Sequence, residues 1–100
     1  MNNKNRLAFE KLSNKEKLDL AIRTKDKKIL EYLAGDINWQ VRLYVAHNEK
    51  TNIETLIRMS EDKNKSVRES VFFAISTRRL SKKDRFKLSK DKNLNKHLGL

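Results

Sequence analysis

One pattern occurs twice in this chain, first as DINWQVRLYV at residues 36–45 and again as DKNKSVRESV at residues 62–71. Asp62 follows Asp36 by 26 residues, and Val71 follows Val45 by the same interval. Both copies share an Asp, an Asn two residues later, a Val-Arg pair and a further Val. A fixed interval of this kind predicts stacked copies of one supersecondary unit.

Capping residues and apolar spacing divide the chain into short helices. A Ser, Thr, Asp or Asn before each candidate helix can accept a hydrogen bond from a first-turn backbone N–H. We expect a short helix from Arg6 to Leu12, and further helices that begin after Ser13, Asp26, Asn38, Thr51, Asn64 and Ser81. The segments 13–16, 51–54 and 81–84 have the spacing of a capping box. Gly35 is expected to end one helix in the left-handed conformation.

Apolar residues at helical spacing identify the expected core. Two Val residues in each copy of the pattern are one helical turn apart and are expected to be buried: Val41, Val45, Val67 and Val71. Trp39 precedes Leu43 by four residues, so we favour a core position for it over stacking on a base or a partner. Phe73 is expected to reach the surface, because Phe72 beside it points elsewhere.

Composition limits the class of protein. One hundred residues predict a single domain over residues 1–100. No apolar run approaches the roughly 20 residues of a membrane helix, and no signal-peptide core follows the first residues, so a cytoplasmic location is expected. The chain has no Cys, and His47 and His97 are its only histidines, so neither a metal site nor a cofactor is expected.

The net charge of +11 is unevenly distributed along the sequence. Residues 1–28 carry +5, residues 29–62 carry −3, and residues 63–100 carry +9. Uniform lysine enrichment indicates only solubility, whereas segregated positive charge indicates an anionic partner.

A longer pattern surrounds the first copy: LAGD at 33–36, VR at 41–42 and VAHN at 45–48, followed by Thr51 and Leu56. This pattern resembles the variant leucine-rich repeat family and the broader HEAT-like class of α-solenoids. The resemblance implies an all-α fold, a short right-handed α-solenoid of about three to four helix-pair repeats, and a role in binding rather than catalysis. The family usually has a Pro near the position of Thr51, and this chain contains none.

The same resemblance implies a ladder of Asp and Arg residues that links successive repeats. The matching pairs are Asp36 with Arg42 and Asp62 with Arg68, and in a degenerate third copy Asp91 with His97. These four Asp and Arg residues of the first two pairs could instead form a ligand site. We favour the structural role, because stacked repeats must satisfy polar groups at their junctions.

The densest basic segment lies near the C-terminal end of the sequence. The candidate nucleic-acid-binding residues are Arg78, Arg79, Lys82, Lys83, Lys87 and Lys90. Lys83, Lys87 and Lys90 share one face of the expected helix, and closely spaced cations of this kind bind phosphates. A solvated charged face is the alternative interpretation of the same residues.

No nucleophile elbow, phosphate loop or pair of acidic residues at catalytic spacing occurs in the sequence, so an enzyme is not expected. The leading hypothesis is a non-enzymatic module that binds nucleic acid, with DNA favoured over RNA, through its basic C-terminal face. The alternative is a protein–protein adaptor or inhibitor whose groove binds an acidic protein.

Overall fold

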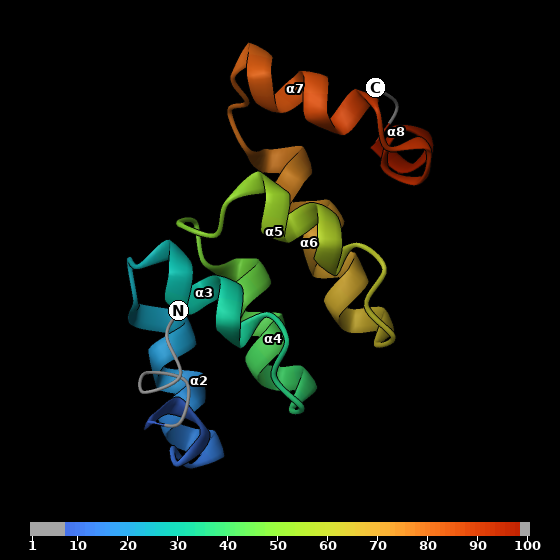
Figure 1. Cartoon of the computed structure of the whole chain (residues 1–100). Helices are drawn as coiled ribbons and strands as arrows, with labels where there is room; N and C mark the ends of the chain where they lie inside the picture. Colours follow the sequence, from blue (N-terminus) through green and yellow to red (C-terminus); the bar gives the residue numbers. More distant parts are fainter. Residues whose placement is uncertain (1–7, 99–100) are drawn as a thin grey trace.

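The computed structural model of the chain describes residues 8–98, with side chains up to residue 96. Helices and no strand occur in that part of the chain (Figure 1). Helical residues 8–10 precede α2 (Asn14–Arg23), α3 (Lys27–Leu33), α4 (Trp39–His47), α5 (Ile53–Met59), α6 (Lys65–Thr77), α7 (Lys82–Ser89) and α8 (Lys92–Leu98). The expected all-α class is therefore confirmed. Of the helix expected from Arg6 to Leu12, the first two residues lie outside the described part.

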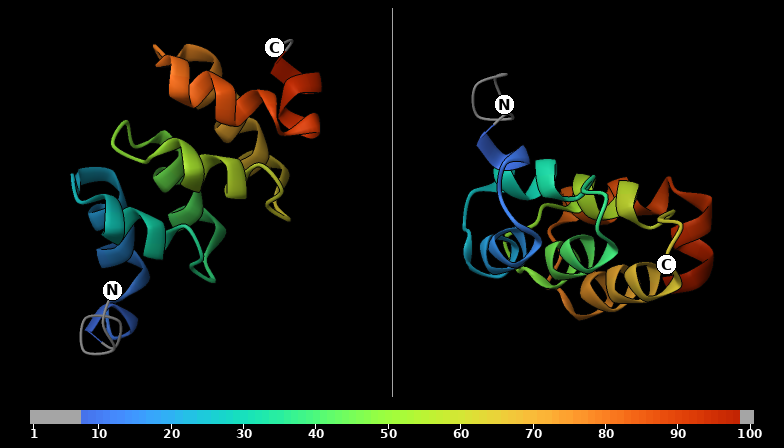
Figure 2. Two further views of the ribbon diagram at one scale, coloured as in Figure 1. Left: turned by 45° about the horizontal axis from the view of Figure 1, so that its top comes forward. Right: turned by 90° about the horizontal axis from the view of Figure 1, so that it is seen from below.

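The helices pack in two layers. In one layer α4 lies between α2 and α6 and contacts both. In the second layer, α3 and α5 cover this row, as the right-hand view of Figure 2 shows. α7 and α8 lie beyond α6, and α8 contacts both α6 and α7. α4 consequently has helices on several sides, whereas the end of the molecule at α7 and α8 is more open.

The Val residues of the repeated pattern lie in the hydrophobic core to which both α4 and α6 contribute. Val41, Val45, Val67 and Val71 have no exposed surface, which confirms their predicted burial. Each buried Val contributes on the order of 1.5–3 kcal/mol through removal of apolar surface from water. Both copies of the pattern thus build one shared core.

Side-chain caps start the helices where the sequence predicts them. Ser13 Oγ accepts the backbone N–H of Glu16, whose carboxylate accepts the N–H of Ser13, so the capping box is complete. Asp26, Asn38, Asn64 and Ser81 likewise accept first-turn N–H groups, at 2.8 to 3.3 Å. These local bonds position the turns that precede each helix.

Two local predictions are wrong. The cap of α5 is Asn52, whose Oδ1 accepts the N–H of Thr55 at 2.9 Å. Thr51 is instead buried and donates its hydroxyl to the Val45 carbonyl at 2.6 Å, so it satisfies the C-terminal end of α4 and is unavailable as a cap. Gly35 does not adopt a left-handed conformation, because the turn after α3 continues in right-handed geometry at Ala34.

Of the two predictions about aromatic residues, one is wrong and one is correct. Trp39 is 40% exposed, so its predicted core position is wrong. It is the first residue of α4, directly after the cap Asn38, and therefore lies at the edge of the layer rather than between helices. Phe73 is 64% exposed, as predicted.

Candidate functional site

The junction between α4 and the turn before α6 is built around a buried arginine. Arg42 Nε lies 2.7 Å from Asp62 Oδ2, and Arg42 Nη2 lies 3.1 Å from Asp62 Oδ1. The remaining terminal nitrogen, Nη1, donates to the backbone carbonyl of Asp36 at 2.7 Å. The two paired side chains are only 7% and 8% exposed. This bidentate pair is inaccessible to a large ligand, and it links α4 to the turn before α6.

The ion pairs of this ladder differ from the predicted ones. The sequence predicted Asp36 with Arg42 and Asp62 with Arg68. Each arginine instead bonds the backbone carbonyl of its predicted Asp, while the carboxylate pairs with a cation that precedes it by about 20 residues. Asp36 thus pairs with Lys17 at 2.9 Å, where both side chains are largely buried. Repetition revealed the Asp residues, but Lys17 lies outside both copies and gave no signal.

The environment of Asp62 stabilises its charged form. Burial on its own would raise the pKa of the Asp62 carboxyl group. The hydrogen bond from Arg42, the backbone N–H of Asn64, and the positive charges of Arg42 and Lys63 act in the opposite direction. Together they lower the pKa below its ordinary value of 3.8, so Asp62 is ionised throughout the neutral range.

A second set of contacts links the turns at the opposite ends of the helices. The side chain of Asn48, after α4, donates to the carbonyls of Ala21 and Thr24, both at 2.9 Å. Arg78, after α6, donates to the carbonyls of Asn48 and Thr51. Thr24 directly follows α2 and Asn48 directly follows α4. The carbonyl after α2 therefore accepts from an amide, and the carbonyl after α4 accepts from a guanidinium group.

Arg78 therefore has a structural role that separates it from the other candidate basic residues. Burial lowers the pKa of its guanidinium group, and the negative charges of Asp84 and Glu49 act in the opposite direction. The group still carries its proton at neutral pH. Its hydrogen bonds point into the molecule, so it contributes to the α4–α6 junction more than to an outer surface.

Lys87 is also occupied within the molecule. Its Nζ pairs with the carboxylate of Glu54, on α5, and its side chain is 31% exposed. The three lysines of the predicted row, Lys83, Lys87 and Lys90, are therefore not equally available to a ligand, because Lys87 is paired with a residue of α5. The signal for this contact was absent from the sequence, because the two partners are 33 residues apart.

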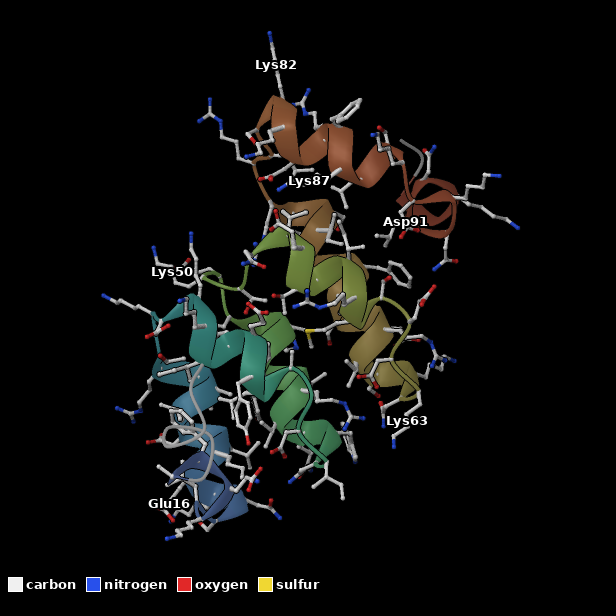
Figure 3. All side chains as sticks on the ribbon, viewed as in Figure 1. Glu16, Lys50, Lys63, Lys82, Lys87 and Asp91 are labelled. Atoms are coloured by element: carbon white, nitrogen blue, oxygen red, sulfur yellow. The ribbon has the colours of Figure 1, made fainter. Side chains whose placement is uncertain are left out.

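The remaining candidate cations are exposed on α7 and on the turn that precedes it. They are Arg79, Lys82, Lys83 and Lys90, and the neighbouring Arg85 of the same basic segment is exposed as well. Figure 3 shows Lys82 extending from the upper end of α7 into open space. Among residues 8–96, none of these five side chains forms an ion pair. This group is named here the α7 cation surface.

An aromatic ring lies within the α7 cation surface. Phe86 is 61% exposed, and Lys90 Nζ lies 4.4 Å from the centre of its ring. Lys83, Phe86 and Lys90 are spaced by three and four residues, so they share one stripe of the helix. Phe86 was not among the predicted site residues, although its spacing from the lysines was visible in the sequence.

A hollow of about 350 Å³ lies between the C-terminal halves of α4 and α6. Its walls are formed by Ala46, His47, Glu49, Phe73, Ala74, Thr77 and Arg78. His47 ends α4, and its Nε2 lies 3.2 Å from Ser70 Oγ.

Comparison of the chain with protein-family models, with curated proteins and with solved structures finds no match. Within the described residues, none of the helices has the length and apolar character that a bilayer crossing requires.

Proposed function

We propose that this protein is a non-enzymatic binding module that contacts nucleic acid, DNA in preference to RNA, through the α7 cation surface. The observation that carries the proposal is the exposure of Lys82, Lys83 and Lys90 around Phe86. Cations that are not paired within the molecule remain available to neutralise phosphates.

The composition of this surface suits a charged backbone with attached bases. Long, flexible lysine side chains follow irregular phosphate positions without requiring one base sequence. An exposed ring such as Phe86 provides a flat surface for an unstacked base. Lys90 covers one side of that ring in the free protein, so its movement toward a phosphate would uncover the ring for stacking.

We also propose that the helices form a short α-solenoid. Two kinds of contact support this architecture. Lys17–Asp36 and Arg42–Asp62 pair a cation with a carboxylate about 20 residues later, and their Asp residues are separated by the interval of the sequence pattern. The Asn48 and Arg78 bonds recur at the other ends of the helices. In such an array, α7 belongs to the last complete pair and is accessible from one side.

The test is the salt dependence of binding to a labelled DNA duplex, measured by fluorescence anisotropy. For the parent, log Kd should rise linearly with log salt concentration. Replacing Lys82, Lys83 and Lys90 together by Gln should reduce the magnitude of the slope by roughly two to three, at about 0.9 per phosphate contact. An RNA duplex of the same sequence should bind more weakly than the DNA, and a Phe86→Ala variant should weaken single-stranded DNA binding.

The matched control removes three exposed lysines at the other end of the chain, Lys25, Lys27 and Lys28, again by substitution with Gln. Net charge falls equally in both variants, so only the position of the charge differs. Equal changes in slope for the two variants would contradict a localised interface. Absence of binding by the parent at low salt would leave the protein–protein alternative as the better explanation of the charge.

A further inference from the structure

Arg68 occupies in α6 the position that Arg42 occupies in α4. One side of its guanidinium group is held in the same way. Arg68 Nη1 donates to the Asp62 carbonyl at 2.6 Å, and Arg42 Nη1 donates to the Asp36 carbonyl at 2.7 Å. A backbone carbonyl therefore anchors each arginine, independently of any carboxylate.

The other side of the two guanidinium groups differs. Nε and Nη2 of Arg42 are both bound by the carboxylate of Asp62. Among residues 8–96, no acceptor contacts Nε or Nη2 of Arg68, and the side chain remains half-buried. Arg68 thus presents a two-donor edge whose equivalent, one helix pair earlier, carries a carboxylate.

The Asp residues of the repeated pattern, and Glu69 beside Arg68, are used elsewhere. Asp36 and Asp62 each accept the N–H of the Asn two residues later, and that Asn caps the following helix. Asp91 instead caps α8 itself, accepting the N–H of Leu94 at 3.0 Å. Glu69 lies 3.8 Å from Lys65 on the exposed side of α6. The third Asp of the pattern therefore caps its helix directly, and the side chain of His97, its predicted partner, lies outside the described residues.

We propose that Arg68 is a binding site for the carboxylate of an Asp or Glu side chain on a protein partner. The planar fork of an anchored arginine matches a carboxylate through two parallel hydrogen bonds. This molecule provides the example, because Arg42 binds Asp62 in that geometry from the same backbone setting. The site lies on α6 and is separate from the α7 cation surface.

The charge around Arg68 favours an acidic partner. Lys63 and Lys65 are exposed on the same turn of chain, and residues 63–100 carry +9. Figure 3 shows Lys63 projecting outward at the lower end of α6, away from α8. A second copy of this chain is disfavoured as the occupant, since residues 1–28 also carry net positive charge. An acidic partner segment with an Asp two residues before a helix cap, as Asp62 stands before Asn64, meets both requirements.

The probe is the blocked peptide EDKNKS, which reproduces residues 61–66 and hence the turn that Arg42 binds. Its effect is followed by NMR through the Arg68 Nε–H resonance and the backbone amides of residues 63–72. A saturable shift is expected with this peptide. The matched peptide ENKNKS, which lacks the carboxylate of the Asp, should bind roughly tenfold more weakly, as expected for loss of a charge-assisted pair of hydrogen bonds.

Two variants locate the site. Arg68→Gln should weaken binding of EDKNKS roughly tenfold, and Arg68→Lys should weaken it severalfold, because an ammonium retains the charge but not the fork. Arg85→Gln removes one exposed charge from α7 and should leave the affinity unchanged. Thermal melting establishes that each variant is folded. If Arg68→Gln does not fold, Arg68→Lys is used for the binding test in its place.

Three results would overturn the proposal. They are the absence of any saturable shift with EDKNKS, equal affinity for the two peptides, and equal loss of affinity in Arg68→Gln and Arg85→Gln. A shift of the Arg68 resonance with a single-stranded oligothymidine but not with EDKNKS would assign the arginine to phosphate instead. That outcome would contradict a carboxylate site while leaving the α7 cation surface intact.

Discussion

The junction around Arg42 and the α7 cation surface contain the same kinds of side chain in opposite circumstances. The Arg42 side chain is 7% exposed, and each of its three side-chain nitrogens, Nε, Nη1 and Nη2, donates a hydrogen bond. Arg79 and Lys82 are exposed and pair with no carboxylate among residues 8–96. The difference shows that burial and partners, more than residue type, decide whether a cation stabilises this fold or remains available to a ligand.

The largest expected effect comes from removing the buried arginine. Arg42→Ala leaves the Asp62 carboxylate buried without its partner, which should reduce the free energy of unfolding by about 3–5 kcal/mol. Urea denaturation followed by circular dichroism measures this loss. Arg79→Ala, the matched exposed arginine, should change stability by less than about 0.5 kcal/mol. Similar losses in both variants would remove the distinction between the two regions.

A smaller effect with a pH signature is expected at Asp62. Asp62→Asn should cost about 1.5–3 kcal/mol at neutral pH through loss of hydrogen bonds to a charged group. Because the folded-state pKa is lowered, this stabilisation is fully present above the ordinary pKa of 3.8 and is lost as pH falls through the folded value. The stability difference between parent and variant should therefore shrink below about pH 4. A difference that stays constant from pH 7 to pH 3 would contradict the ionic description of this pair.

Arg78 tests the assignment of one predicted site residue to the scaffold. Arg78→Gln removes the donors to the Asn48 and Thr51 carbonyls, and should lower the free energy of unfolding by about 1–3 kcal/mol. Differential scanning calorimetry of this variant beside Arg79→Gln compares adjacent arginines of equal charge. Greater destabilisation by Arg79→Gln would reverse the roles assigned here.

The smallest effect is expected in the turn between α3 and α4. A Cβ atom added at Gly35 would meet only the Tyr32 carbonyl oxygen, at an ordinary 3.8 Å, and the backbone is not left-handed there. Gly35→Ala should therefore stabilise the protein by about 0.4–1 kcal/mol, because alanine lowers the conformational entropy of the unfolded chain. A decrease in the melting temperature would indicate that the turn needs the freedom of glycine.

Local signals in the sequence were sufficient for the helices and for part of the junction. Caps such as Asp26 and Asn38 act within three residues, so short-range spacing reveals them. The same reasoning failed for Thr51, whose hydroxyl donates a hydrogen bond to the Val45 carbonyl near the end of the preceding helix. It also failed for Trp39, because spacing alone does not show which end of a helix lies at the edge of a layer.

The candidate site was less predictable, because its geometry depends on contacts between distant segments. The basic residues were visible as a cluster, but Lys87 meets Glu54 and Arg78 meets Thr51 only in the folded chain. Lys17 entered the ladder without any sequence signal, since a lysine outside the repeated pattern resembles any other surface cation. Sequence identifies the charges, and folding decides which of them remain free.

Two double variants test the division between structural and available cations most directly. One replaces Lys82 and Lys83 by Gln, and the other replaces Arg78 and Lys87 by Gln, so each loses two positive charges from neighbouring parts of the chain. The measurement is the slope of log Kd against log salt concentration for a DNA duplex, at a temperature where both variants are folded.

The Lys82/Lys83 variant should reduce the magnitude of that slope by nearly two, at about 0.9 per phosphate contact, and keep the parent melting temperature. The Arg78/Lys87 variant should keep the parent slope and melt at a lower temperature. An equal reduction in slope for both variants, or a reduction only in the Arg78/Lys87 variant, would contradict the central claim that the exposed cations of α7 contact nucleic acid.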